Sequence, residues 1–586
     1  MQVQLSPDKT QVLFIPSETK EYLTLNKFPG FIRAGLGYTA PAFAPFAFNL
    51  VARLQAKGLK VKVSKEVQTL FDTAFTLKTL PEDFNYWTPP LTFQDIALRY
   101  LYTLGSAGIL LDPGMGKTKV ILDYIYLMKF FKVLVVCPKP LMFVWEDEIP
   151  KHRPELGVYL VKTTDWNIEG PAIGATSGVI VMNYTKAALL KTQLSTVGFN
   201  FIYLDEFLIK NAETQRTQAM LQLAQNIPYR SGGSGTLINN TPLDAFCPIK
   251  YLQPCLVGGN FKHFQNEYTH KVELKGQFYP NGKPKELIVG FKKQKEVKSI
   301  LESCCIVMTK DEWLTLPAKH IHDIVVPMSA EQDQAYDLLS RNYYLRLSDG
   351  DDIEVDNPLV MLAKLYQIAN GFVYINQETP GIVAAELLAQ ELPKSAKTKQ
   401  RTFFFDEQPK VEALRNLLTR TIPGLKAIIW FNLSAEFTLI SALLDELEVN
   451  YLTIRGGEKD VGGKVRTFNR TPSVTYLLCQ AKSVNYGITV MGTKSKDLET
   501  ENIEALPDIE TCVYTEVFYS LSFSLEVLLQ QMDRIHRIGQ EHECDYYRII
   551  TDCPVEEKIV NALGKKLQLK EEMLVDFAKT VLEATP

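Results

Sequence analysis

The feature that most constrains the fold is a glycine-rich turn between an apolar run and a helix-like run. In AGILLDPGMGKTKVILDYIYLM, residues 107–128, the continuous apolar residues at 109–111 predict a parallel strand covered on both faces. Gly114 and Gly116 let backbone N–H groups, including that of Met115, turn toward phosphate oxygens, and the following helix adds the positive end of its dipole. The turn lacks the first glycine of the strict pattern G-x-x-x-x-G-K-[ST]. It predicts a phosphate-binding site, with a ligand-free glycine turn as the alternative.

Side chains after this turn and after a second strand complete a nucleotide-hydrolysis pattern. Lys117 can reach the β- and γ-phosphates of ATP, and Thr118 can ligate Mg²⁺. A phosphate turn of this kind needs an acidic partner on a neighbouring strand. The segment FNFIYLDEFLIKN, residues 199–211, supplies one: Asp205 is predicted to hold Mg²⁺ and Glu206 to orient or deprotonate the attacking water. The sequence therefore predicts a nucleoside triphosphate and Mg²⁺ as cofactors. These two motifs alone are compatible with a kinase, a GTPase, a transporter subunit or a nucleic-acid motor.

The rest of the chain predicts an α/β protein with more than one core. A chain of 586 residues exceeds what one core supports, and strands alternate with helices in two separate regions. The predicted fold class is α/β, with two lobes that are each a doubly wound parallel sheet, a small N-terminal accessory domain and a helical, lysine-rich insertion between the lobes. The expected boundaries are 1–90 for the accessory domain, 91–260 for the first lobe, 261–400 for the insertion, 401–560 for the second lobe and 561–586 for a C-terminal helix.

The second α/β region contains no phosphate turn, but it carries two closely spaced arginines. In LEVLLQQMDRIHRIGQ, residues 525–540, Arg534 and Arg537 are three positions apart and are expected on one face of a helix. They are predicted to act as arginine fingers on ATP held by the first lobe. A solvated helix face is the alternative.

These motifs, in this order, resemble the Swi/Snf-type DNA translocases of helicase superfamily two, from about residue 91 to the C-terminal helix. The resemblance implies that the two doubly wound parallel-sheet lobes are RecA-like. The resemblance implies that Gln94, in LTFQDIALRYL, reads adenine and that Gln530 belongs to the nucleotide site. It also implies that the loop after a further strand, with Ser234, Gly235 and Thr236, couples hydrolysis to DNA.

The sequence departs from the family pattern at two positions. Leu208 stands where the family has a relay histidine, and Leu237 stands where it has proline. Hydrolysis is expected to survive these changes, whereas the details of coupling are open.

The resemblance implies an ATP-dependent translocase on double-stranded DNA that remodels or reanneals branched DNA. The alternatives are a helicase of the same superfamily that unwinds RNA or single-stranded DNA, and a degenerate ATPase that acts as a DNA-bound scaffold. Residues 1–90 weakly resemble the substrate-recognition domain of HepA-related annealing helicases, or they buttress the first lobe.

A lysine-rich stretch offers a second candidate DNA surface. Residues 271–298 contain eight lysines, among them Lys292, Lys293 and Lys295, with interleaved aromatic residues. A solvated hairpin and helix face is the alternative. The formal net charge of −4 argues against a uniformly basic coat, but it does not exclude a local basic groove.

Composition and targeting signals predict the cellular compartment of the protein. The nine cysteines show no metal-ligand spacing, which indicates reduced, buried thiols. Neither a secretory signal nor an apolar run of membrane-spanning length is recognisable, so a soluble intracellular protein is expected. The absence of long polar tails or a basic localisation run favours the bacterial cytoplasm or a virus-infected host cell over the nucleus.

Overall fold

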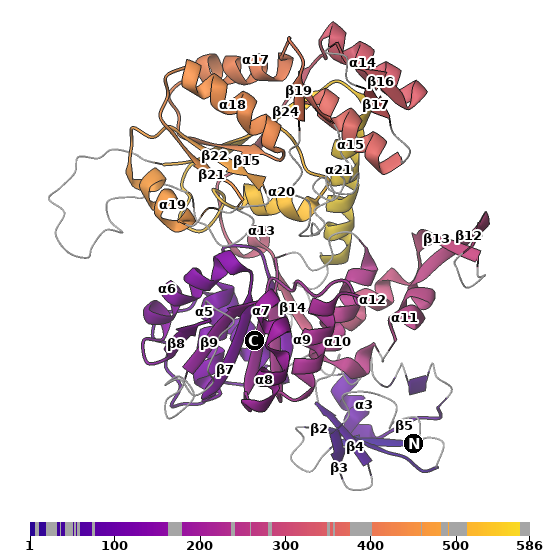
Figure 1. The fold of residues 1–586 in the computed structure, drawn as a ribbon. Helices are drawn as coiled ribbons and strands as arrows, with labels where there is room; N and C mark the ends of the chain where they lie inside the picture. The colour runs from indigo at the N-terminus through magenta and orange to yellow at the C-terminus, as the bar shows by residue number, and fades with distance from the viewer. Residues whose placement is uncertain are drawn as a thin grey trace, which may run out of the picture. The chain divides into compact units, whose positions relative to one another are not determined.

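The computed structural model describes most of the chain in two compact units. The described residues are 1–5, 11–18, 32–34, 37–41, 51, 54–55, 59–72, 77–161, 178–235, 241–257, 260–278, 284–348, 352–354, 358–375, 401–456, 458, 460–481, 490 and 512–574. The first unit runs from Met1 to Leu314 and the second from Thr315 to Leu569, with the last residues of the chain grouped with the first unit. Figure 1 labels the elements of both units.

The centre of the first unit is a seven-stranded sheet in which every pairing is parallel, with the order β14-β6-β11-β10-β7-β9-β8. Its strands are β6 (Ala107–Leu111), β7 (Lys132–Cys137), β8 (Gly157–Leu160), β9 (Gly178–Asn183), β10 (Phe201–Asp205), β11 (Tyr229–Gly233) and β14 (Cys305–Met308). Strands β6 and β10 are buried along their whole length, which explains why they read as continuous apolar runs.

Helices alternate with these strands along the chain. They are α4 (Thr92–Leu104), α5 (Lys117–Leu127), α6 (Met142–His152), α7 (Tyr184–Leu189), α8 (Lys191–Thr196), α9 (Gln215–Gln225), α10 (Phe246–Leu252), α11 (Phe261–Tyr268), α12 (Gln294–Glu302) and α13 (Lys310–Trp313), with short 3-10 turns at Lys139–Leu141, Pro242–Ala245 and Pro254–Leu256. Local sequence sets several of their starts. Asn183 caps α7 and Thr214 caps α9, because each side chain accepts a hydrogen bond from a backbone N–H of the first turn.

Two smaller sheets also belong to the first unit. Near the N-terminus, β1 (Gln2–Leu5), β2 (Gln11–Ile15), β3 (Ile32–Ala34), β4 (Gly37–Pro41) and β5 (Lys62–Val63) form a sheet of order β3-β4-β2-β1-β5, followed by α3 (Lys65–Asp72). The lysine-rich stretch begins as an antiparallel hairpin of β12 (Thr269–Phe278) and β13 (Pro284–Phe291). The structure thus contains the hairpin and the helix, α12, that the alternative interpretation of this stretch named.

The second unit contains a six-stranded sheet, again with only parallel pairings, of order β15-β24-β23-β20-β22-β21. Its strands are β15 (Lys319–Val326), β20 (Ala427–Phe431), β21 (Tyr451–Ile454), β22 (Tyr476–Gln480), β23 (Thr515–Phe518) and β24 (Cys544–Thr551). Two hydrophobic clusters hold this sheet; Trp430 belongs to one and Phe431 to the other, as expected for side chains that alternate between sheet faces.

The remaining elements of this unit are mostly helical. They are α14 (Ala330–Asn342), α15 (Pro358–Ala369), α17 (Pro409–Asn416), a π-helical turn at Leu417–Thr421, α18 (Ser434–Glu446), α19 (Val461–Arg470), α20 (Leu525–Met532) and α21 (Pro554–Leu574), with two antiparallel strand pairs, β16 (Tyr344–Arg346) with β17 (Asp352–Glu354) and β18 (Phe372–Ile375) with β19 (Arg401–Phe404). In the described part of the chain, every helix is too short or too polar to cross a membrane.

The predicted fold class, two doubly wound parallel-sheet lobes with a small N-terminal part, is confirmed. The structure distributes the predicted insertion differently, because β14 lies in the sheet of the first unit and β15 lies in that of the second. Parallel strands that pair with distant partners cannot be assigned to a sheet from local sequence, since their register depends on tertiary contacts.

Candidate nucleotide site

Three segments that are far apart in sequence meet at the carboxyl edge of the first sheet. The glycine turn follows β6, Asp205 ends β10, and Ser234 follows β11. Strand β11 lies between the other two, with Gly233 in register with both Asp205 and Ile109. The carboxyl edge of a parallel sheet is where α/β proteins bind ligands. The fold therefore brings the predicted phosphate and metal residues of the first lobe together.

The glycine turn has the conformation of a phosphate cradle. Gly114 and Gly116 have φ of 86° and 79°, left-handed values that favour glycine, and Gly116 is the N-cap of α5. Lys117 is buried and donates from Nζ to the carbonyl of Leu111 at 2.9 Å. Backbone N–H groups at a helix start and a buried ammonium group suit an anionic ligand. ATP phosphates fit this turn.

The predicted adenine-reading residue contacts the turn directly. Gln94 is buried in the first turn of α4, and its Nε2 donates to the carbonyl of Met115 at 3.1 Å, while its Oε1 accepts from the backbone of Leu91 at 3.0 Å. A Cβ at Gly116 would lie 2.4 Å from Gln94 Nε2, so the glycine is needed for this approach as well. Recognition of adenine by Gln94 stays a prediction.

Asp205 is buried at the end of β10 and receives a hydrogen bond at 3.0 Å from Trp145 Nε1, on α6. Burial raises the pKa of Asp205, while the charge of Lys117 and the bond from Trp145 act to lower it. The hydroxyl of Thr118 and the carboxylate of Asp205 are the oxygen donors that Mg²⁺ prefers, and this cation binds through few protein ligands. The donor set fits Mg²⁺.

Glu206 sits in a strained turn. Glu206 and Phe207 have φ of 60° and 23°, unusual for residues with side chains and typical of functional sites. The buried ring of Phe207 fills the space above Gly232, where a Cβ would lie 2.4 Å from its Cζ. This packing holds the turn that directs Glu206.

The predicted coupling loop contacts both halves of the site. Ser234 Oγ donates to Glu206 Oε2 at 3.4 Å, and a Cβ at Gly235 would lie 2.4 Å from Cδ of Pro113 in the glycine turn. Thr236 and Leu237 lie outside the described residues. The start of this loop is therefore next to the phosphate turn and the predicted catalytic carboxylate.

Sequence reasoning missed two tyrosines at the site. Tyr184 donates from its hydroxyl to the carbonyl of Asp205 at 2.8 Å and accepts from the backbone of Leu208 at 3.4 Å, the position where the relay histidine is missing. Tyr203 lies on the same face of β10 as Asp205, and the two-residue period of a strand could have revealed it.

The second unit holds the predicted arginine fingers, but not on a helix. Helix α20 ends at Met532, so the expectation that Arg534 and Arg537 share one helix face is wrong. The segment is fixed as a loop by Gln540, whose Nε2 donates to the carbonyls of Val513 and Ile535, each at 3.0 Å. These backbone bonds depend on β23 and its approach, which local sequence does not show.

The two arginines and Gln530 differ in burial. Arg534 and Gln530 are buried, whereas Arg537 is partly exposed. Arg534 lies close enough to the buried Glu516 for the charges to interact, and Trp430 Nε1 donates to that carboxylate at 3.1 Å. Burial raises the pKa of Glu516 well above its usual range, against the opposing effects of Trp430 and Arg534. The role of the arginines on ATP stays a prediction.

The lysine-rich surface is partly neutralised by its own carboxylates. Lys293 lies 3.6 Å from Glu267 and 3.9 Å from Glu296, whereas Lys292 is half-buried and Lys295 is exposed. DNA contact by Lys292, Lys293 and Lys295 stays a prediction.

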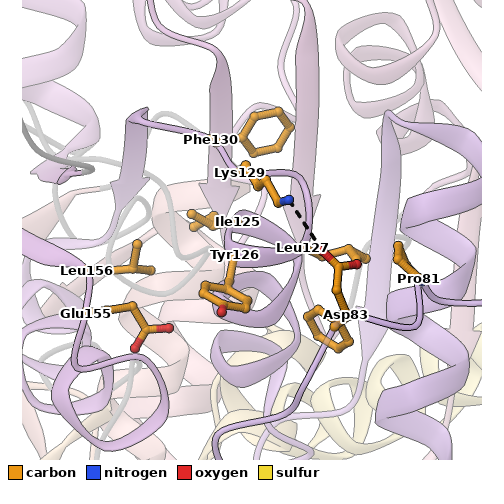
Figure 2. A pocket seen from close by; sticks show the side chains of 10 residues that line it. Pro81, Asp83, Ile125, Tyr126, Leu127, Lys129, Phe130, Glu155 and Leu156 are labelled. Carbon is orange, nitrogen blue, oxygen red and sulfur yellow. Dashed lines mark ion pairs between the residues drawn. The ribbon is translucent and has the colours of Figure 1, made fainter.

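A separate cavity of about 470 Å³ lies at the C-terminal end of α5, the helix that begins at Lys117. Figure 2 shows the side chains that line it. Lys129 and Asp83 form an ion pair of 3.6 Å across it. Its lining consists of Pro81, Asp83, Phe84, Ile125, Tyr126, Leu127, Lys129, Phe130, Glu155 and Leu156. None of the predicted site residues lines this cavity.

Comparison with known proteins agrees with these motifs. The model of the SNF2-related domain matches residues 55–371, more than half of the chain. The TATA-binding protein-associated factor MOT1 of Saccharomyces cerevisiae is 24% identical, covering 74% of this chain and 24% of that protein. The yeast ISWI chromatin-remodeling complex ATPase ISW1 is 22% identical over 87% of this chain and 42% of its own length. An uncharacterized ATP-dependent helicase of Mycoplasma genitalium is 21% identical, over 80% and 40%.

The chain thus spans less than half the length of these curated relatives. A solved structure, the Sulfolobus solfataricus SWI2/SNF2 ATPase core in complex with dsDNA, is 19% identical and covers 86% of this chain and 97% of its own, with a TM-score of 0.35. That score is too low to add to the fold assignment, which rests on the two parallel sheets.

The relatives overturn one compositional expectation. Similar proteins come from yeast, from Arabidopsis thaliana (Protein CHROMATIN REMODELING 24) and from Homo sapiens (TATA-binding protein-associated factor 172), as well as from a mycoplasma. The preference for a bacterial or viral setting over the nucleus is therefore wrong, because composition does not separate these sources. The family model and the motifs identify the chain itself: it belongs to the SNF2-related family of helicase-like ATPases.

Proposed function

We propose that this protein hydrolyses ATP to translocate along double-stranded DNA. The observation that carries the proposal is the convergence of Lys117, Asp205 and Glu206 with the coupling loop at one edge of the first sheet. Family membership supports ATP hydrolysis, and one relative is named as the ATPase of a chromatin-remodeling complex, which favours DNA as the substrate.

Each residue of the site then has a role in phosphoryl transfer. Lys117 and the turn at Gly114, Met115 and Gly116 bind the phosphates, and Gln94 and Gln530 contribute to the nucleotide site. Thr118 and Asp205 would hold Mg²⁺, which supplies positive charge to the phosphate oxygens. Glu206 orients water for attack on the γ-phosphate and accepts its proton. Arg534 and Arg537 stabilise the transition-state charge from the second unit.

Coupling to DNA passes through the loop that begins at Ser234. The Ser234 hydroxyl donates a hydrogen bond to Glu206, and Gly235 packs against Pro113 in the glycine turn. Because the loop contacts both groups, movement of the attacking water or release of the γ-phosphate shifts it. A tyrosine-mediated backbone contact at Leu208 takes the place of the missing histidine relay. These contacts support a coupled motor over a scaffold without turnover.

We further propose that the output is remodelling or reannealing of branched DNA, with residues 1–90 and the lysines at 292, 293 and 295 contributing DNA contacts. The test is the ATPase rate of the full chain on duplex, single-stranded, forked and four-way DNA and on RNA. Duplex DNA should stimulate the rate at least tenfold, and branched DNA more than linear duplex. Stimulation by RNA or single-stranded DNA alone would favour an unwinding helicase, and absence of turnover would favour a scaffold.

A further inference from the structure

Tyr203, one of the two tyrosines that sequence reasoning missed, has its hydroxyl near the stem of Lys117. It precedes Asp205 by two residues on β10, and its side chain is completely buried. Its ring lies 5.6 Å from the indole of Trp145, which itself bonds to Asp205. Tyr203 therefore packs inside the group of side chains that positions the predicted metal ligand.

A glycine on the neighbouring strand makes room for this hydroxyl. A Cβ at Gly233 would lie 2.2 Å from the Tyr203 hydroxyl oxygen and 3.1 Å from Cδ of Lys117. The hydroxyl and the stem of the phosphate-binding lysine thus share the space that any other residue at position 233 would fill. The Tyr203 hydroxyl can approach Lys117 because residue 233 has no side chain.

The hydroxyl has no hydrogen bond of ordinary geometry within the part of the chain that the structure describes. A buried polar group without a partner costs about 1–3 kcal/mol. The Asp205 side chain is close enough to interact with this hydroxyl and is the acceptor available to it. A tyrosine hydroxyl is an O–H donor, and the carboxylates of Asp205 and Glu206 are acceptors near it.

We propose that Tyr203 is a positioning residue for the magnesium–nucleotide complex. When nucleotide binds, its hydroxyl donates to the Asp205 carboxylate and, together with Trp145, fixes the rotation of that carboxylate toward the metal. Two donors on one carboxylate remove its rotational freedom, as supporting residues around metal ligands do elsewhere. The inference rests on the proposed ATP site, but it does not depend on DNA translocation.

Tyr203→Phe is a selective test, because it removes one oxygen and keeps the ring against Trp145 and Gly233. The matched control is Tyr251→Phe, a second buried tyrosine of the first unit, whose hydroxyl donates to the carbonyls of Ile202 and Ser231. Binding of a fluorescent ADP is titrated against Mg²⁺ for the full-length protein and both variants. Melting temperatures are measured without nucleotide and with Mg²⁺ and ADP, and kcat for ATP with duplex DNA is measured separately.

The proposal predicts that Tyr203→Phe needs about tenfold more Mg²⁺ to tighten ADP binding, the effect of one lost hydrogen bond to a charged group. It also predicts a melting temperature without nucleotide equal to or above that of the wild type, and a smaller rise on adding Mg²⁺ and ADP. Tyr251→Phe should lower the melting temperature and leave the Mg²⁺ requirement unchanged. An unchanged Mg²⁺ requirement in Tyr203→Phe overturns the proposal and makes the residue part of the core. Wild-type protein that binds Mg²⁺ and ADP but is not stimulated by DNA would contradict the proposed function while leaving this inference intact.

Discussion

Trp145 and Asp205, sixty residues apart in sequence, are joined by a buried 3.0 Å hydrogen bond from the indole nitrogen to the carboxylate. The bond connects α6 to the end of β10 and fixes one oxygen of the predicted Mg²⁺ ligand. The second unit repeats the arrangement, because Trp430 donates to the buried Glu516 at 3.1 Å. In both units an indole satisfies a carboxylate whose burial would otherwise be costly.

Replacing Trp145 with phenylalanine should therefore impair metal-dependent hydrolysis. The ring is retained in part, but Asp205 loses a charge-assisted donor worth roughly 1.5–3 kcal/mol. We expect kcat for ATP to fall about tenfold or more and the Mg²⁺ requirement to rise. Phe143→Leu, on the same helix but half-exposed, serves as the control and should keep wild-type rates. Equal Mg²⁺ requirements in the two variants would show that the indole bond does not position the ligand.

The close fit of Phe207 over Gly232 predicts a coupled pair of mutations. Gly232→Ala places a methyl group 2.4 Å from Phe207 Cζ and 3.0 Å from the carbonyl of Leu204, so we expect a loss of about 1–3 kcal/mol in the free energy of unfolding and reduced ATPase activity. Phe207→Ala removes the first of these clashes.

The double variant should be less destabilised than the sum of the two single variants, which a denaturation cycle measures. Gly564→Ala, where a Cβ would meet nothing within 4 Å, is the control and should be neutral or slightly stabilising. Strict additivity of Gly232→Ala and Phe207→Ala would mean that the two residues do not share this space.

Glu516 should matter for the arginine loop of the second unit. Glu516→Gln keeps an oxygen acceptor for Trp430 but replaces the carboxyl group near Arg534 with an amide. We expect about a tenfold fall in kcat for ATP, with nucleotide binding by the first unit unchanged in a fluorescent-ADP titration. A variant with wild-type kcat would show that the carboxyl group of Glu516 does not prepare Arg534 for catalysis.

Lys364 predicts a measurable pH dependence of stability. It is buried in α15, donates to the carbonyl of Tyr374, and burial lowers its pKa to about 8 from an ordinary value of 10.5. The unfolded chain binds the proton more tightly, so this residue lowers stability below pH 8, and that penalty disappears as the pH rises from about 8 toward 10.5.

Lys364→Met should therefore stabilise the protein at pH 7, by about 1–3 kcal/mol after allowing for the lost hydrogen bond. Its advantage over the wild type in melting temperature should shrink between pH 8 and pH 10. The exposed Lys558→Met provides the comparison and should show no such trend. A constant difference between Lys364→Met and wild type across this range would contradict the lowered pKa.

The sequence motifs predict the part of the site in the first unit well, because each motif there consists of residues that are close together in sequence. A glycine turn, a lysine and a strand-ending carboxylate pair are each specified within a few residues, and parallel pairing of β6, β11 and β10 brings them together. The loop form of residues 533–540 could not be predicted, because it depends on bonds from Gln540 to backbone groups near β23.

The role of Tyr203 was also hidden, since it depends on Gly233, whose strand pairs with β10 at a separation of 28 residues in sequence. The local hydrophobic pattern of a strand indicates that a side chain is buried. It does not indicate which atoms of distant residues pack against that side chain.

The central claim is that Lys117 holds ATP phosphates at a site whose turnover duplex DNA controls. The most direct test measures ATP hydrolysis by the wild type and by Lys117→Ala, each with and without double-stranded DNA, after circular dichroism has shown equal folding. The account predicts DNA-stimulated turnover in the wild type and a loss of at least a hundredfold in Lys117→Ala. Full DNA-stimulated turnover by Lys117→Ala would contradict it.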